Sequence, residues 1–429
     1  MRTMTTECRR ERAPPTSGRR RPANGRPAAT GAAYSADMIR RHFHITIALV
    51  VALLAAAGCG GGSGDSAPAG ASLSQAGGAG MGADGASNGG TGSGASGSGS
   101  GSGAGSGTAS GTGGTSDPGS PVTYGNLSSA AFGAGASLKG ALPFPADNPW
   151  NTDISNAPVD PSSNALIASI GLTRGLHPDF GSGLYDGAPI GIPYVVVGAG
   201  QPKVAIHFTA YGSQSDPGPY PIPPDAAVEG EQVGVPGSGG DRHLLVIDRD
   251  NQRLYELFRA FPNGDGSWNA DSAAVFHLDS NTVRPTAQPG WTSADAAGLP
   301  IFPGLARYDE AASGVIRHAL RFTAAVTRKA YVPPATHWAS STTDPNRPPM
   351  GMRVRLKASF EIPASFSTES RALLQAMKTY GMLLADNGSN WYVSGAPDPR
   401  WNNSRLLAEL GQAKGSDFEV VRMDGLVTP

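Results

Sequence analysis

Cysteine is nearly absent from this chain of 429 residues. The only two cysteines, Cys8 and Cys59, precede the part of the chain that is rich in large apolar side chains. That part therefore offers no disulfide, no thiol nucleophile and no zinc site built on thiolates. A segment of about 300 residues buries enough surface to fold without disulfides, so an oxidising compartment is still compatible with the sequence.

An excess of positive charge is also absent beyond the N-terminal segment. The first 58 residues carry ten arginines and three acidic residues, so 23 basic and 31 acidic residues remain from Cys59 onward, a net charge of −8. Binding to nucleic acid or to an anionic membrane surface requires clustered positive charge. The composition therefore argues against a nucleic-acid partner.

No apolar run reaches the length of a membrane span. The longest, residues 45–57, has thirteen residues, whereas a helix needs about 20 to cross a bilayer. Its length suits the apolar region of a signal peptide, which we place at 38–58, with Met38 as the start and Arg40 and Arg41 in the basic region. Residues 1–37 are then either a misassigned upstream segment or a disordered extension.

The end of this run resembles the bacterial lipobox. Ala56-Ala57-Gly58-Cys59 places small residues before a cysteine. The resemblance implies a lipidated Cys59 and a protein anchored outside the cytoplasm in the cell envelope, on the outer membrane if the host has one. A plain signal peptide is the alternative. The Gly/Ser-rich stretch that follows in 59–120 predicts a flexible linker with a reach of roughly 40–50 Å.

The remaining segment, 121–429, predicts one β-rich globular domain of the α+β class, ordered from about residue 142. Its alternating or apolar runs are rich in β-branched and aromatic residues and are bounded by Pro and Gly. We expect a sandwich or barrel of antiparallel strands. The predicted strands are 190–197, 203–211, 242–248, 253–260, 315–323, 351–362, 382–385, 391–394 and 418–423.

At least two helices are expected beside these strands. Ser367 can cap a helix that runs to Tyr380, and Asn403 a second helix over 404–413. Residues 162–170 and 293–297 are shorter helical candidates. Hairpin turns are predicted at 248–252 and, more strongly, at 386–389, where Asn-Gly supplies positive φ.

The most suggestive segment for chemistry is the Pro- and Gly-rich loop 216–243. It contains Glu229 and ends in Asp241-Arg242-His243, immediately before an apolar strand. Carboxylates near a histidine serve general acid–base chemistry when burial raises one pKa. We therefore take Glu229, Asp241 and His243 as catalytic candidates, with Asp386 as a further one. The alternative is an acidic surface loop in which Asp241 and Arg242 pair.

Three further residue patterns are weighed between a functional and a structural interpretation. Glu256 shares a strand face with Leu254 and Phe258, which suits either a carboxyl of raised pKa or a residue at a strand edge. His318 alternates with apolar residues as a hydrogen-bonded core histidine would. The basic stripe over 353–357 either lines a groove for an acidic glycan or forms the solvated side of a sheet.

The familiar cofactor motifs are missing. The chain has no G-x-S-x-G, P-loop, dinucleotide fingerprint or H-E-x-x-H, so no cofactor or metal is expected. Three stretches, 175–181, 291–298 and 385–389 (GLHPDFG, WTSADAAG and ADNGS), resemble a type of secreted microbial domain. The resemblance implies no activity and no catalytic residue.

The sequence favours an envelope lipoprotein whose domain binds polysaccharide and cleaves it by general acid–base chemistry, as a glycoside hydrolase or a polysaccharide lyase. All six tryptophans lie in the domain, where exposed rings would stack on sugars. The alternative is a non-catalytic surface adhesin or binding module. Whether the domain is an enzyme stays open at this point.

Overall fold

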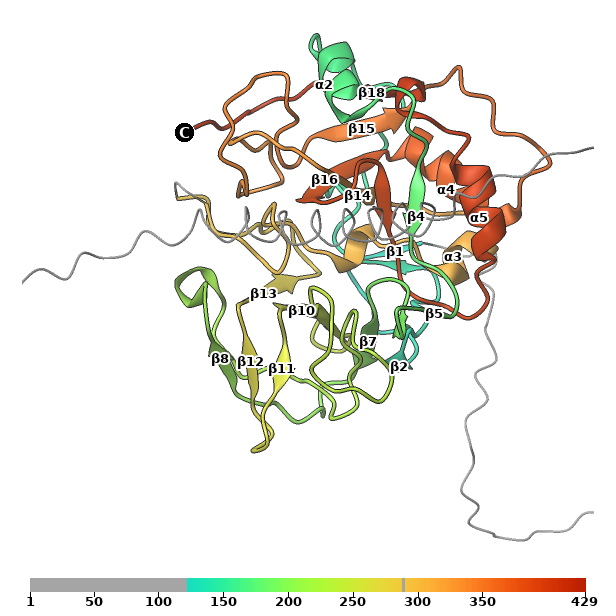
Figure 1. Cartoon of the computed structure of the whole chain (residues 1–429). Coiled ribbons are helices and arrows are strands. Elements are labelled where there is room, and N and C mark those ends of the chain that lie inside the picture. The colour runs from blue at the N-terminus through green and yellow to red at the C-terminus, as the bar shows by residue number, and fades with distance from the viewer. Residues whose placement is uncertain (1–121, 288–289) are drawn as a thin grey trace, which may run out of the picture. The chain divides into compact units, whose positions relative to one another are not determined.

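The computed structural model describes residues 122–287 and 290–429, all within one compact unit (Figure 1). The predicted extension 1–37, signal peptide 38–58, lipidation site Cys59 and linker 59–120 all lie outside the described residues. Within the described ranges, no helix combines the length and the apolar character that a membrane span requires.

A five-stranded sheet forms the lower half of the view in Figure 1. Its order is β13-β10-β9-β7-β2, with β2 antiparallel to β7, β7 parallel to β9, and β9, β10 and β13 antiparallel. The turn predicted at 248–252 is confirmed, because Asp248 pairs with Arg253 across it. The bounds are β2 Gly133–Ala134, β7 Tyr194–Val197, β9 Leu244–Asp248, β10 Arg253–Phe258 and β13 Ser272–His277.

A six-stranded sheet forms the upper half of that view. Its order is β18-β15-β16-β14-β17-β4, and it mixes antiparallel pairs with the parallel pairs β14·β16 and β17·β4. The bounds are β4 His177–Asp179, β14 Leu320–Ala324, β15 Arg353–Leu356, β16 Met382–Asn387, β17 Tyr392–Ser394 and β18 Phe418–Val420.

The two sheets share one hydrophobic core. Leu245 and Leu254 from the five-stranded sheet and Phe322 and Leu384 from the six-stranded sheet belong to it. The alternate residues of β9 and β10, such as Val246 and Leu257, belong to a second core that also contains Trp268 from β12. Side chains of alternating direction thus pack the five-stranded sheet between two apolar layers.

Three smaller sheets complete the strands. Two of these strands, β1 and β3, lie near the start of the described residues. The ordered domain therefore begins earlier than the predicted residue 142, and Leu127 and Leu138 are already buried in the main core. The three-stranded sheet has the order β11-β12-β8, and β1·β3 and β5·β6 form two-stranded sheets. The bounds are β1 Thr123–Tyr124, β3 Ala141–Leu142, β5 Leu184–Tyr185, β6 Ala188–Pro189, β8 Ile206–Phe208, β11 Phe261–Pro262 and β12 Trp268–Ala270.

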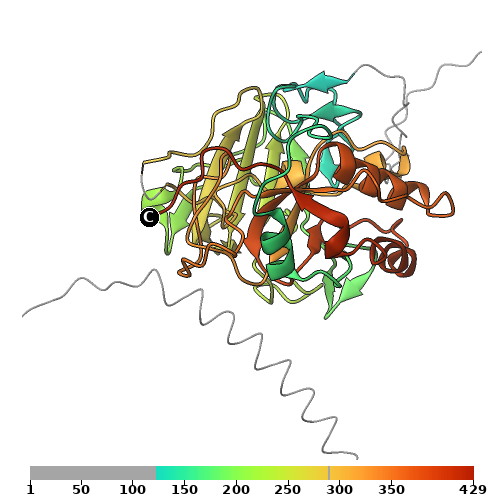
Figure 2. The ribbon, with the colours of Figure 1, turned by 90° about the horizontal axis from the view of Figure 1, so that it is seen from above.

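The helices are short and few. In Figure 2, α4 and α5 lie on the side away from the five-stranded sheet. Ser367 caps α4 as predicted, because its Oγ accepts the amide hydrogen of Ser370 at 3.1 Å. The α-helices are α2 Ser163–Ile170, α3 Tyr308–Ala312, α4 Thr368–Thr379 and α5 Asn403–Leu410, and the 3-10 helices are Gly212–Gln214, Phe302–Gly304 and Gly415–Asp417.

The β-rich α+β class is confirmed, and the arrangement is sandwich-like, since no sheet in the described part of the chain closes on itself. Three local predictions were wrong. Residues 293–297 form a buried loop rather than a helix. The cap of α5 is Asn402 instead of Asn403. The 386–389 turn closes no hairpin, because β14 lies between β16 and β17 and Gly388 does not adopt positive φ.

Candidate functional site

A row of polar side chains crosses one face of the six-stranded sheet. Asp386 pairs with Thr323, and Ser394 pairs with Asp179. Phe322 lies opposite Val393 in the antiparallel pair β14·β17, so Arg321 on β14 falls beside Ser394. Neighbouring positions across a sheet share a face. Strand register therefore gathers Asp386, Arg321, Ser394 and Asp179 although they are far apart in sequence.

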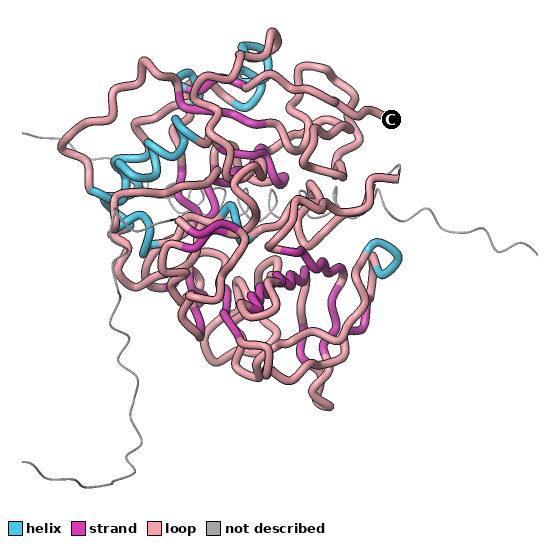
Figure 3. Tube along the Cα trace, turned by 180° about the vertical axis from the view of Figure 1, so that it is seen from behind, coloured by secondary structure: helices cyan, strands magenta, loops and turns pink. Residues whose placement is uncertain are grey.

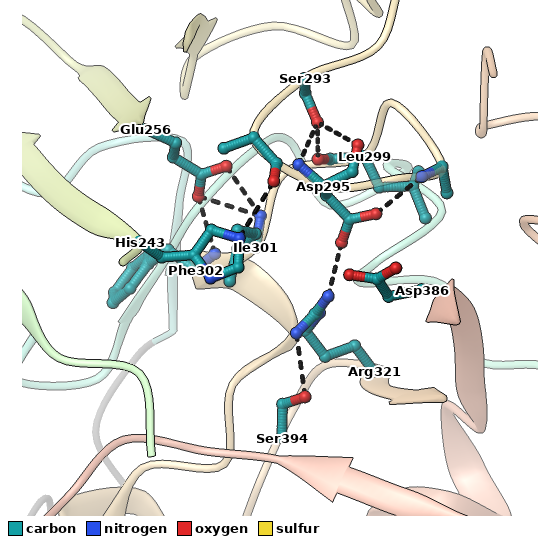
Figure 4. A network of polar contacts seen from close by, with 12 residues as sticks. His243, Glu256, Ser293, Asp295, Leu299, Ile301, Phe302, Arg321, Asp386 and Ser394 are labelled. Carbon is teal, nitrogen blue, oxygen red and sulfur yellow. Dashed lines mark hydrogen bonds and ion pairs between the residues drawn. The ribbon is translucent and has the colours of Figure 1, made fainter. Parts of the chain in front are cut away.

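Arg321 is the buried centre of this row (Figure 4). Its Nη2 donates to Asp295 Oδ2 at 2.7 Å and its Nη1 to Ser394 Oγ at 2.9 Å, while both charged side chains are almost fully buried. Burial of a charge is tolerated when it is paired and hydrogen-bonded in this way. Arg321 thus fixes Asp295 over the sheet.

Asp295 reaches the sheet from the loop 291–301. Ser293 Oγ accepts the amide hydrogen of Asp295 at 2.9 Å and donates to the carbonyl of Leu299 at 2.7 Å. The amide of Ala297 donates to Asp295 Oδ1 at 2.9 Å. These local bonds replace the expected helix, because Ser and Asp side chains compete with the backbone for its hydrogen bonds.

Asp386 is half-buried at the end of β16 and faces Asp295 and Arg321 (Figure 4). Burial, and next the negative charge of Asp295, raise the pKa of Asp386 to about 7, although Arg321 opposes the shift. A carboxyl group held near its midpoint at neutral pH is suited to transfer a proton.

Glu229 and His243 form a charged pair beside this row. His243 is 4 % exposed, its Nδ1 is hydrogen-bonded to Glu229 Oε2, and its Nε2 lies 3.1 Å from the carbonyl oxygen of Ala294. Burial alone would lower the pKa of His243, but the charge of Glu229 and its hydrogen bond raise it to about 9. The imidazolium donates at both nitrogens, so His243 is a fixed cation.

The same pair holds Glu229 ionised. Burial alone would raise its pKa, but the charge and hydrogen bonds of His243 lower it overall. The Glu229 side chain remains 23 % exposed. Its Oε1 has no hydrogen bond to another described residue, so one carboxylate oxygen is left for a ligand.

Glu256 lies on β10 in the five-stranded sheet and is fully buried. Its carboxylate accepts the amide hydrogens of Ile301 and Phe302, each at 2.9 Å (Figure 4). Burial raises the pKa of Glu256 to about 7 against these hydrogen bonds. The reading of Glu256 as a strand-edge residue was therefore wrong, and its raised pKa accompanies a role in anchoring the 291–301 loop.

Asp241 and Asp179 are exposed beside the pair and the row. The charge of Asp241 contributes to the raised pKa of His243, Asp386 and Asp179. The four predicted residues, Glu229, Asp241, His243 and Asp386, thus share one electrostatic neighbourhood.

Arg242, which the surface-loop alternative paired with Asp241, has an acidic partner elsewhere in the same loop. Arg242 is buried and binds Glu231 at 2.6 Å, and it also donates to the carbonyls of Ser238 and Ala260. Through these contacts Arg242 secures the long loop 216–243, which ends in the site. Loops of this kind, drawn in pink in Figure 3, connect the strands and helices throughout the described part of the chain.

Comparison of the chain with family models, with curated proteins and with solved structures finds no match. The interpretation of the site therefore depends on its geometry alone.

Sequence reasoning missed three residues of the site: Asp179, Asp295 and Arg321. Each lay in or beside a stretch that the sequence had singled out. Asp179 and Asp295 lie in the GLHPDFG and WTSADAAG stretches, and Arg321 lies in the predicted strand 315–323 that also contains His318. The register of β14, β17 and β4 places Arg321 near Asp179, and the ion pair with Arg321 brings Asp295 to them.

Other flagged residues serve the fold. His318 is a core histidine, bound to Glu310 at 2.9 Å and to the carbonyl of Ala319 at 2.8 Å. Arg355 is buried and pairs with Glu419 at 2.7 Å, whereas Arg353 and Lys357 of the 353–357 stripe are half-buried. None of the tryptophans is exposed enough for a stacking platform, since four are buried and Trp291 and Trp338 are half-buried. No cluster of three metal-ligating side chains occurs among the described residues.

Proposed function

We propose that the domain binds polysaccharide and cleaves it by general acid–base hydrolysis at the Asp386–Glu229 site. The proposal is carried by one observation: a half-buried carboxyl of pKa about 7, Asp386, stands in the same charge network as a carboxylate of lowered pKa, Glu229. Two carboxyl groups whose environments separate their pKa values supply an acid and a base.

The roles follow from the protonation states. Asp386 donates the proton to the departing oxygen, and Glu229 takes a proton from water or attacks through its unbonded oxygen. His243 keeps Glu229 ionised, and Arg321 positions Asp295, whose negative charge helps to keep Asp386 protonated. The exposed Asp179 and Asp241 border the site.

The charge of the site favours hydrolysis over elimination. A lyase that acts on uronic acids must neutralise the substrate carboxylate with a cation. Arg321 and His243 are already engaged by Asp295 and Glu229, and Asp179 and Asp241 add negative charge. A neutral or amino-bearing glycan suits this balance better than an acidic one.

The binding-module alternative has one observation of its own. Leu184 and Tyr185 on β5 are 56 % and 78 % exposed, and Val233 is 69 % exposed. The amide of Val233 donates to the carbonyl of Gly187 at 2.9 Å, so the hairpin and the 231–235 loop lie together. An exposed apolar patch of this kind suits contact with another protein.

The proposed site is tested by screening the purified protein against neutral, amino-bearing and acidic polysaccharides. We expect release of reducing ends from a neutral or amino-bearing glycan. Asp386→Asn and Glu229→Gln should each lower turnover by about 10²-fold or more, because each removes one proton-transfer group. Asp279→Asn is the matched control, since Asp279 is an exposed surface residue paired with Arg253.

Full turnover in both site variants would remove these residues from the mechanism. Release of unsaturated products from an acidic glycan would favour elimination instead.

The site of action is a further part of the proposal. The lipobox-like segment before Cys59 supports anchoring of the protein in the cell envelope, where polysaccharide substrates are found.

A further inference from the structure

A cavity of about 500 Å³, distinct from the proposed site, is lined in part by residues 298–300 of the 291–301 loop. Its wall is mainly apolar and includes Phe144, Trp150, Phe276 and Leu383. Asp386, Glu229, His243 and Arg321 do not line it. Cavities of this volume and lining hold small organic molecules.

One charged side chain lines this apolar wall without a carboxylate partner. Arg353 on β15 donates from Nε to the carbonyl of Tyr380 at 2.8 Å and from Nη2 to the carbonyl of Thr152 at 3.1 Å. It forms no ion pair with a described residue, and its Nη1 has no hydrogen bond to one. Desolvation lowers the pKa of Arg353 to about 10, with only a partial counter-effect from the charge of Asp153.

The neighbouring arginine shows that this arrangement is unusual for the strand. Arg355 also donates to backbone carbonyls, those of Ile154 and Ala157, but it has Glu419 as an ion-pair partner at 2.7 Å. The other charged groups of the cavity wall, Arg422 and Asp424, bind one another at 3.2 Å and are exposed. Of the two arginines that line the cavity, Arg353 is the one without an ion-pair partner among the described residues.

Arg353 is half-buried in this apolar wall, and a guanidinium withdrawn in part from water is stabilised by an anion beside it. From this charge and the apolar wall, we propose that the cavity binds a small organic carboxylate with an apolar body. The carboxylate accepts a hydrogen bond from Arg353 Nη1, and the apolar body packs against the aromatic wall. Charge complementarity therefore selects the acid over a neutral molecule of the same shape.

The test uses isothermal titration of the full chain with 2-naphthoate and decanoate, and with their neutral amides. We expect at least one acid to bind about tenfold or more tightly than its amide, the smaller end of what a charge-assisted hydrogen bond contributes. No measurable binding of either acid, or equal affinity for acid and amide, would overturn the proposal.

Variants locate the binding. Arg353→Met should abolish the preference for the acid, whereas Arg355→Met removes a comparable set of carbonyl contacts outside the cavity wall and should leave it unchanged. Retained preference in Arg353→Met would place the anion elsewhere. If Arg353→Met does not fold, the comparison of acid with amide on the unaltered protein still decides the question.

Discussion

The chemistry proposed for this protein depends on a few side chains whose ionisation is set by their neighbours. Asp386 and Glu229 are both carboxylic acids, yet their pKa values are shifted in opposite directions. Asp386 lies near another carboxylate, Asp295, whereas Glu229 is bonded to the cationic His243. The difference between an acid and a base is thus made by the second layer of residues.

The buried carboxyl of Glu256 should make the stability of the protein depend on pH. The pKa of Glu256 is raised to about 7 in the folded protein, so the folded state binds a proton at this carboxyl more tightly than the unfolded state does. This difference in proton binding stabilises the folded state fully at pH values below the ordinary pKa of glutamate. The contribution is lost as pH rises through about 7. Glu256→Gln should therefore reduce the fall in unfolding free energy between pH 5 and pH 8 by roughly 1–3 kcal/mol.

Urea denaturation at a series of pH values measures this effect. Glu361→Gln, at an exposed position, is the control and should leave the pH dependence unchanged. An unaltered slope in Glu256→Gln would mean that this carboxyl does not retain its proton. Asp386 contributes a slope of the same sign, so the variant flattens the curve only in part.

At the scale of the elements, local pattern predicted strands well and their partners poorly. All nine predicted strand segments contain observed strands, because β-branched runs between Pro and Gly have few other ways to bury their side chains. The Ser367 cap of α4 was also readable, since capping is a local interaction.

The partners of a strand depend on contacts that local sequence does not contain. Asn387-Gly388 predicted a hairpin, but β14 inserts between β16 and β17 from more than 60 residues away. The same insertion brings Arg321 between Asp386 and Ser394. Glu229, Asp241, His243 and Asp386 could be selected by residue type and position in the sequence. Arg321 could not, because its place beside Asp386 depends on the parallel pair β14·β16, and Asp295 could not, because it reaches the site from a loop through its ion pair with Arg321.

For the whole molecule, the sequence predicts export of the domain and its attachment to a membrane through a flexible linker. Residues 45–57 predict a signal segment, Cys59 a lipid attachment point and 59–120 a linker. The proposed site is acidic, which disfavours acidic glycans, and the domain has no exposed tryptophan on which a sugar could stack. We therefore propose neutral or amino-bearing glycans that are held by polar contacts.

Lipidation is tested with Cys59→Ser. We expect the unaltered protein to enter the detergent phase on phase separation and the variant to remain in the aqueous phase, because an acyl anchor contributes about 0.8 kcal/mol per buried CH₂. Ser63→Ala, in the predicted linker, is the control and should partition as the unaltered protein does. Detergent association that survives in Cys59→Ser would contradict the anchor.

The proposed mechanism requires that Asp386 holds its proton near neutral pH. It is tested most directly by following the carboxyl carbons of ¹³C-labelled aspartate by NMR from pH 3 to pH 9 and assigning the Asp386 signal with Asp386→Asn. We expect a midpoint near 7 for Asp386. A midpoint near 4, the ordinary value for aspartate, would contradict it.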